Sequence, residues 1–295
     1  MPKNEILSIK LIAMKILIIT IWSLCCLNLS AQQGKSFRIT STYAMFPDSI
    51  RNKEPRIYDG KTYTASEHYN DSSAYIFVPD YFDKNKPFTY VVYFHGWGNN
   101  IDSALVQYKL KEQFYNAQLN AIFIFPEGPK NAPDSYGGKF EKPDTFNYFM
   151  KDAEQFLKRE KLITTKQQAN IIYAGHSGAY RVMSYLLLHS TYNCKGILLF
   201  DALYAELEKF SMYLQMHPSC KLIDIYTDNG GTIQNSKILM TDMLAWHWPF
   251  LSTEEDDVTQ SQLKTNRIIF LHSKNKHNDV VSLNNNFTRF LQAVF

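Results

Sequence analysis

The stretch NIIYAGHSGAYRV, residues 170–182, joins two different patterns around one serine. Residues 170–174 form a short apolar run, and from Ala179 the apolar residues recur at helical spacing. Ser177 stands between them in the sequence GHSGA. A serine on a sharp turn between a buried strand and a helix projects its hydroxyl out of the sheet, and small flanking residues let the turn pack closely. Ser177 is therefore a candidate nucleophile; the alternative is a tight turn with an inert serine.

Similar apolar runs recur along the chain. They are YVVYF (90–94), AIFIF (121–125), GILLF (196–200), KLIDIY (221–226) and RIIFL (267–271). Continuous runs of this kind are typical of strands buried on both faces. Helical patterns lie between them at 146–157, with Asp144 as the expected N-cap, at 179–187 and 233–244, and at the C-terminus. The alternation predicts a doubly wound, mostly parallel sheet. FRITSTYAMF (37–46) and SSAYIFVP (72–79) instead alternate, which predicts antiparallel strands at a sheet edge.

In sheets of this kind, ligand sites lie at the carboxyl ends of the strands. HGWGNN, residues 95–100, follows the run at 90–94. Asp201 directly follows the run at 196–200, and Asp228 closely follows the run at 221–226. Two histidines follow the run at 267–271, His272 at once and His277 five residues later. A general base must reach the nucleophile, so we favour His277, which lies in a loop, over His272.

Taken together, these residues resemble the α/β-hydrolase superfamily from about residue 37 to 295. The resemblance rests on HGWG, on GHSGA and on the chain order Ser, Asp, His; it departs from the common G-x-S-x-G pattern at Ala179. It implies a mostly parallel eight-stranded sheet with helices on both faces. The segment between the runs at 196–200 and 221–226 is too short for a large lid domain.

The resemblance also implies roles for individual residues. Ser177 corresponds to the nucleophile and His277 to the general base. The main-chain N–H groups of Gly178 and of Gly96 or Trp97 correspond to the oxyanion hole. The acid stays open between two residues, Asp228 and Asp201. We prefer Asp228 slightly, because the family usually places its acid after that strand.

Three further residues are candidates for substrate binding: His95, Tyr180 and Trp246. Trp246 belongs to the aromatic segment WHWPF (246–250), which forms either a wall beside the site or a loop anchored by buried aromatic rings. Arg181 would bind an anionic substrate group or pair with a carboxylate, and we favour the second.

Three functions are compatible with this sequence. The first is an exported serine esterase that acts on small or carbohydrate-linked esters through an acyl-enzyme. The second is a serine peptidase or amidase that acts on peptide or cell-wall substrates, and the third is a non-catalytic binding protein with the same fold. The sequence contains no metal-binding spacing and no dinucleotide-binding motif, so we expect no cofactor. A net charge of only +3 argues against a nucleic-acid partner.

The N-terminus resembles an export signal. Lys15 precedes an apolar run, residues 16–27, and the small residues Ser30 and Ala31 follow it. We expect cleavage after Ala31, with Met14 as an alternative start. A single domain would then span residues 32–295, in the periplasm or outside the cell and without a stable membrane span. An uncleaved anchor is the alternative, and lipidation at Cys25 or Cys26 fits poorly.

Two cysteines, Cys194 and Cys220, would remain after this cleavage. Each stands just before a lysine and an apolar run, which predicts that both lie at the same end of two neighbouring strands. Because disulfides persist outside the cytosol, a Cys194–Cys220 bridge is one prediction, and two buried free thiols are the alternative.

Overall fold

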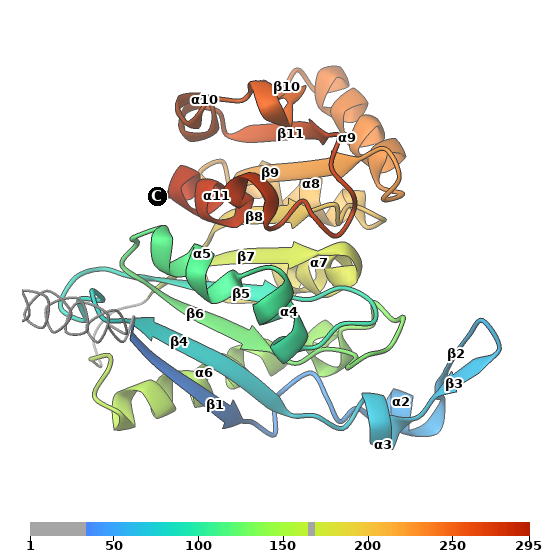
Figure 1. Ribbon diagram of the computed structural model, residues 1–295, viewed down its shortest axis with the longest axis vertical. Coiled ribbons are helices and arrows are strands. Elements are labelled where there is room, and N and C mark those ends of the chain that lie inside the picture. The colour runs from blue at the N-terminus through green and yellow to red at the C-terminus, as the bar shows by residue number, and fades with distance from the viewer. Residues whose placement is uncertain (1–33, 165–168) are drawn as a thin grey trace, which may run out of the picture. The chain divides into compact units, whose positions relative to one another are not determined.

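A nine-stranded sheet forms the centre of the protein in a computed structural model that describes residues 34–164 and 169–295 (Figure 1). The strand order is β1-β4-β6-β5-β7-β8-β9-β11-β10. The strands from β6 to β10 pair in parallel, whereas β4 is antiparallel to β6. The expected mixed sheet is confirmed, but the expected number of eight strands is wrong. The residues of the expected signal, 1–31, lie outside the described part of the chain.

The six apolar runs form the inner strands. These are β5 (Thr89–Phe94), β6 (Ala121–Pro126), β7 (Asn170–His176), β8 (Cys194–Phe200), β9 (Lys221–Thr227) and β11 (Ile268–Ser273). Every residue of β5 and β6 is buried, as expected for strands covered on both faces. In the nine-stranded sheet, the strand that the sequence does not predict is β10 (Leu251–Glu254), whose four residues are all at least partly exposed. It forms the edge of the sheet next to β11, where no apolar pattern is needed.

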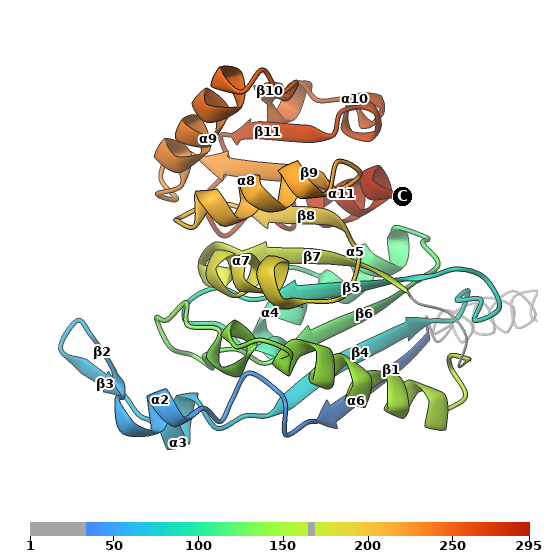
Figure 2. The same cartoon turned by 180° about the vertical axis from the view of Figure 1, so that it is seen from behind.

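Helices cover both faces of the sheet, and their apolar residues form two hydrophobic cores (Figures 1 and 2). One face carries α4 (Ile101–Gln107), α5 (Leu110–Asn116), α10 (Gln260–Thr265) and α11 (Asn286–Val294). The other carries α6 (Thr145–Arg159), α7 (Tyr180–His189), α8 (Leu207–Met216) and α9 (Ile233–Ala245). The helices expected at 146–157, 179–187, 233–244 and the C-terminus are thus present. Asp144 precedes α6, although its side chain caps no main-chain N–H.

The N-terminal part of the described chain lies at the other edge of the sheet. β1 (Gly34–Thr40) and β4 (Ser73–Pro79) are the edge strands there. Between them come α2 (Ser49–Lys53), α3 (Ala65–His68) and a two-stranded hairpin of β2 (Arg56–Tyr58) and β3 (Lys61–Tyr63). The hairpin projects away from the sheet in both views (Figures 1 and 2).

The parallel pairing brings the loops after β5, β6, β7, β8, β9 and β11 to one edge of the sheet. Only residues 201–206 separate β8 from α8, and no lid domain is inserted in the described part of the chain. Within that same part, no helix is both long and apolar enough to cross a lipid bilayer. The polar residues singled out in the sequence follow these strands and lie at the edge formed by the carboxyl ends of the strands.

Candidate active site

Ser177 lies on the sharp turn between β7 and α7. Its φ of 55° is in the left-handed region, which residues other than glycine rarely adopt, and the side chain is only partly buried. The turn is tight enough to require Gly175, because a Cβ atom there would come within 2.6 Å of both the Ala179 Cβ and the Met183 Sδ. The small residues around Ser177 therefore have a steric cause. Ala179 replaces the more usual glycine without a clash because position 175 leaves room for its methyl group.

The loop after β5 packs directly against this turn. A Cβ atom at Gly96 would lie 2.5 Å from the Ser177 Cβ and 3.2 Å from its Oγ, so only glycine allows this approach. The Trp97 indole lies against Gly178 and is fixed by a hydrogen bond from its Nε1 to the Ser135 Oγ at 2.7 Å. Among the described residues, the main-chain N–H of Trp97 has no hydrogen-bond partner.

His277 is held in place by Asp201. The imidazole Nδ1 donates a hydrogen bond to the Asp201 Oδ2 at 2.7 Å, and this contact fixes the tautomer in which Nε2 carries the lone pair. Asp201 directly follows β8 and has a φ of 47°. The residue is fully buried, with 0% of its surface exposed, whereas 26% of the His277 side chain is exposed. The pair thus consists of a buried carboxylate and an accessible imidazole.

Asp201 is ionised in spite of its burial. Burial by itself raises the pKa of this carboxyl, but hydrogen bonds from His277, Thr227 and Thr232 more than offset that effect and leave the pKa below its ordinary value. The Thr227 hydroxyl donates to the Asp201 Oδ2 at 2.6 Å, and the Thr232 hydroxyl donates to Oδ1. A carboxylate with this many donors stays negative and stabilises a positive charge on the neighbouring imidazole.

A cavity of about 410 Å³ opens over Ser177. Its lining comprises Trp97, Ser135, His176, Ser177, Gly178, Tyr180, Tyr204, His277 and Asn278. Ser177 and His277 therefore face the same space. Three aromatic rings form much of the remaining wall, and the Tyr204 hydroxyl donates to the Gly230 carbonyl oxygen. Burial raises the pKa of Tyr204 to about 12, so this phenol remains a neutral hydrogen-bond donor.

The loop that carries His277 is also tied to the serine turn itself. The His176 Nε2 donates to the His277 carbonyl oxygen at 2.9 Å, and the two imidazole rings are 4.5 Å apart. Burial and the nearby His277 lower the pKa of His176 to about 3. His176 is therefore neutral, with a tautomer set by its donation to the loop.

The other aspartate and histidine form a separate pair. His272 Nε2 lies 2.9 Å from the Asp228 Oδ1, and His272 Nδ1 lies 2.9 Å from the Glu254 Oε1. Asp228 makes no contact with His277, so our preference for Asp228 over Asp201 as the acid is not supported by the geometry. The cause is the direction of the loop after β11, which turns back across the sheet toward β8 and brings His277 to Asp201.

Two of the three residues expected to bind substrate do not line the cavity over Ser177. The His95 side chain is buried behind the loop, with 1% exposed, and pairs with Glu127. Trp246 directly follows α9 and packs on Trp248, which in turn packs against the core and lies under the Arg267 guanidinium. The aromatic segment at 246–250 is thus an anchored loop. Tyr180 does line the cavity, and Arg181 forms a bidentate pair with Glu141 at 2.7 and 2.8 Å.

Comparison with known proteins rests on structure alone, because no protein-family model and no curated protein matches this sequence. One similar structure is FphF, a fluorophosphonate-binding serine hydrolase of Staphylococcus aureus, with a TM-score of 0.54, 10% identity, and coverage of 89% of this chain and 99% of that one. A ferulic acid esterase is similar with a TM-score of 0.54 and 13% identity, over 89% of this chain and 100% of that one. A feruloyl esterase module from Clostridium thermocellum, complexed with sinapinate, is similar with a TM-score of 0.57 and 12% identity, over 91% of this chain and 90% of that one.

The chain has the α/β-hydrolase fold. At 10–13% identity the likeness establishes the fold and not the chemistry, so the function has to be argued from the residues at the site. Ser177, Asp201 and His277 follow β7, β8 and β11, in that order along the chain.

Sequence reasoning missed several residues of this site. Ser135 and Tyr204 line the cavity, but each lies in a loop without a recognisable pattern. Glu127 had a signal, because it is a charged residue one position beyond the apolar run at 121–125 and its proline; in the structure it is 1% exposed. Within the described residues, no three His, Cys, Asp or Glu side chains gather in a way that could hold a metal ion.

Proposed function

We propose that this protein is a serine hydrolase that cleaves a carboxylic ester, with Ser177 as nucleophile, His277 as general base and Asp201 as acid. The observation that carries the proposal is the bond from His277 to buried Asp201, made by an imidazole that shares a cavity with Ser177. A serine hydroxyl is a weak nucleophile near neutral pH, and such an imidazole is what activates it.

The reaction would proceed in two balanced steps. Ser177 Oγ attacks the acyl carbon while His277 Nε2 takes its proton, and the main-chain N–H groups of Gly178 and Trp97 stabilise the tetrahedral oxyanion, with Gly96 shaping the approach. Collapse of this intermediate breaks the ester C–O bond, and His277 returns the proton to the leaving alcohol. Water then attacks the acyl-enzyme by the same route, releasing the acid and restoring Ser177.

The cavity favours a compact acyl group with a flat, apolar face. Its volume of about 410 Å³ is at the small end of the range for ligand sites, and Trp97, Tyr180 and Tyr204 supply aromatic walls. Two of the structurally similar proteins are ferulic or feruloyl esterases, one with sinapinate bound, which agrees with an aromatic acyl group. We propose small or carbohydrate-linked esters of this kind as substrates.

A substrate panel tests this function. Nitrophenyl esters of acetate, butyrate and a cinnamic acid should be hydrolysed by the wild type and not by Ser177→Ala, which retains only background binding. Peptide anilides serve as the comparison for the peptidase alternative. Faster hydrolysis of the anilides than of the esters would favour the peptidase function over the esterase function. If neither class of substrate is hydrolysed, the non-catalytic binding protein is the function that stays.

We further propose that the protein is exported, with residues 1–31 as its signal, and that Cys194 and Cys220 become bonded in the oxidising compartment. The two cysteines are buried free thiols in this structure, at the expected end of β8 and β9, with their sulfurs 4.0 Å apart. Sequencing the N-terminus of the protein recovered outside the cytosol tests the first proposal. The proposal requires Gln32 as the first residue, and an intact N-terminus would contradict it.

A further inference from the structure

The loop that carries Gly96 and Trp97 is hydrogen-bonded to the loop after β6 at Gly98, Asn99 and Asn100. Gly98 N–H donates to the Ala132 carbonyl at 2.9 Å, and the Asn131 N–H donates to the Asn99 carbonyl at 2.8 Å. The Asn100 side chain adds a bond from Nδ2 to the Asn131 Oδ1 at 2.7 Å. These contacts are made outside the cavity, so they constrain the loop without touching a substrate.

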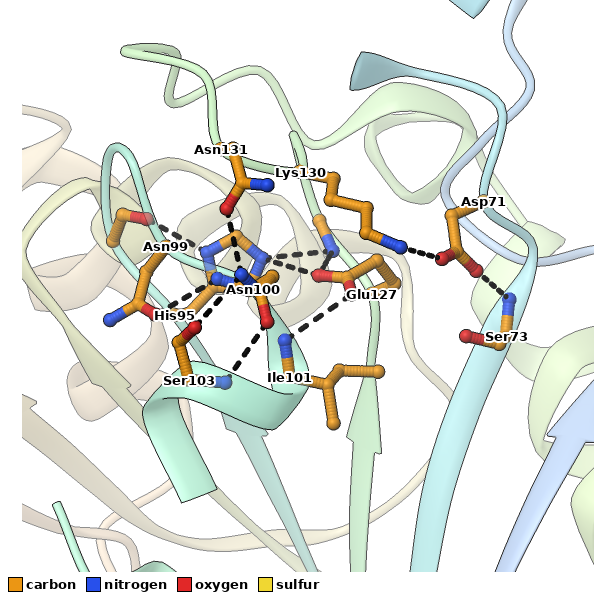
Figure 3. Close-up of polar contacts among 12 residues, drawn as sticks. Asp71, Ser73, His95, Asn99, Asn100, Ile101, Ser103, Glu127, Lys130 and Asn131 are labelled. Carbon is orange, nitrogen blue, oxygen red and sulfur yellow. Dashed lines mark hydrogen bonds and ion pairs between the residues drawn. The ribbon is translucent and has the colours of Figure 1, made fainter. Parts of the chain in front are cut away.

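The buried carboxyl group of Glu127 contacts residues at both ends of this loop (Figure 3). Its Oε1 lies 2.9 Å from the His95 Nε2, at the start of the loop, and its Oε2 accepts from the Ile101 N–H at 3.2 Å, at the end. The His95 and Glu127 side chains are 1% and 2% exposed. Glu127 follows β6 and thus connects the neighbouring strand to the loop that covers Ser177.

His95, Glu127 and the Gly128 main-chain N–H form one buried polar cluster. The His95 Nδ1 is 2.7 Å from the Gly96 carbonyl oxygen, which can only accept, so Nδ1 carries a hydrogen. On the other side, the Nε2 lone pair accepts from the Gly128 N–H at 3.1 Å, and the same N–H lies 3.3 Å from the Glu127 Oε1. Removing one partner would leave the other buried and unpaired, which is costly.

We propose that Glu127 is a positioning residue for the oxyanion hole, acting through His95 and the Ile101 N–H. This proposal rests on the proposed function. Its physical reason is the close packing of Gly96 on Ser177: an ideal Cβ there would be 2.5 Å from the Ser177 Cβ, so any displacement of the loop changes the position of the Gly96 and Trp97 N–H groups relative to the serine. Misplacement by about 1 Å can cost on the order of 100-fold in rate.

A different buried glutamate closes the loop that carries His277. Glu255 is 2% exposed and accepts four hydrogen bonds. At the start of the loop the donors are the Ser273 hydroxyl and the Asn275 Nδ2, the latter at 3.0 Å. At the end they are the Nδ2 atoms of Asn284, at 3.0 Å, and Asn286, at 2.5 Å. Because both ends meet on one carboxylate, we infer independently that Glu255 is a positioning residue for His277.

The two glutamates differ in what glutamine can replace. Glutamine at position 127 can still accept from the Ile101 N–H with its amide oxygen, and its amide N–H can share the His95 Nε2 lone pair with the Gly128 N–H. Glutamine at position 255 loses one of two acceptor oxygens and presents an N–H₂ group to two of the four donors. Glu127→Gln should therefore keep most of the function that Glu127→Leu loses, whereas Glu255→Gln should lose function.

The test uses the full-length protein in five forms: wild type, Glu127→Leu, Glu127→Gln, Glu255→Gln and the surface variant Glu160→Gln as a control. Active sites are counted with a fluorophosphonate probe, and kcat and KM are measured per labelled site with a nitrophenyl ester. The dissociation constant of a boronic acid, whose tetrahedral adduct on Ser177 places an oxygen in the oxyanion hole, is measured in parallel.

We expect Glu127→Leu to lower kcat per site about 100-fold at an almost unchanged KM and to weaken boronate binding by a similar factor. Glu127→Gln should stay within about tenfold of the wild type, and Glu255→Gln should lower kcat about 100-fold. If Glu127→Leu reduces only the number of labelled sites and leaves kcat per site unchanged, Glu127 acts in folding and the proposal for Glu127 is overturned. A wild-type kcat per site in Glu255→Gln overturns the inference for Glu255. Absence of wild-type labelling would instead refute the proposed function.

Discussion

His277 and Asp201 are 76 residues apart in sequence, yet the histidine Nδ1 donates to the aspartate Oδ2 at 2.7 Å. Neither residue could be assigned to the other from the chain alone, because Asp228 follows a neighbouring strand and offers the same carboxylate. The fold brings the loop after β11 past β9 to the end of β8, which selects Asp201. The proposed triad therefore depends on the path of one loop.

The first prediction compares the two aspartates. Asp201→Asn removes the negative charge that stabilises the imidazolium and allows the wrong tautomer, so kcat should fall about 10³- to 10⁴-fold. Asp228→Asn is the matched control, since Asp228 contacts His272 and not His277, and its kcat should stay within a few-fold. Steady-state kinetics with one nitrophenyl ester decides the matter. A larger loss in Asp228→Asn would reassign the acid.

A second prediction concerns the tight turn under Ser177. Gly175→Ala forces a new Cβ to within 2.6 Å of the Ala179 Cβ and should destabilise the fold by about 1–3 kcal/mol. Ala179→Gly removes that methyl group, so the double variant should recover part of the loss. Urea denaturation of the four proteins gives the coupling energy, for which we expect at least about 0.5 kcal/mol. Strictly additive losses would show that the two positions do not compete for space.

A third prediction is a pH dependence of stability. Burial raises the pKa of Asp224, in the middle of β9, from 3.8 to about 7, and its Oδ1 has no partner among the described residues. Between these two values the unfolded carboxyl ionises while the folded one keeps its proton, so stability falls as the pH rises from about 4 to 7.

Asp224→Asn should flatten that dependence. The amide oxygen can still accept the hydrogen bond that the Ser236 hydroxyl now donates to Asp224 Oδ2 at 2.6 Å. Urea midpoints measured at several pH values from 4 to 8 would show the difference, which should be largest at the alkaline end. Identical slopes in both proteins would mean that Asp224 titrates normally.

A fourth prediction concerns the thiol pair. Oxidation of Cys194 and Cys220 closes a loop between residues 26 apart in sequence, which should raise the free energy of unfolding by about 3 kcal/mol. Exported protein should therefore melt at a lower temperature after reduction, and Cys194→Ala/Cys220→Ala should be insensitive to reductant. Equal melting temperatures for the wild type with and without reductant would argue for permanently free thiols.

Much of the fold was predictable because strands buried on both faces consist of continuous apolar runs, and all six runs became inner strands. The edge strand β10 was missed because the sequence LSTE needs no apolar face at the rim of a sheet. That Ser177 and His277 face one cavity was predictable because strand ends and loop reach constrain both residues. The choice between Asp201 and Asp228, and the burial of His95 on Glu127, depend on loop paths that no local pattern encodes.

The most direct test of the account is the chemistry of one hydroxyl group. The folded protein is incubated with a fluorophosphonate probe, and the adduct is located by mass spectrometry of its peptides, with Ser177→Ala as the control. The account predicts one adduct per chain, on Ser177, whose formation slows strongly in Asp201→Asn. An unlabelled wild type, or an adduct on another residue that persists in Ser177→Ala, would contradict it.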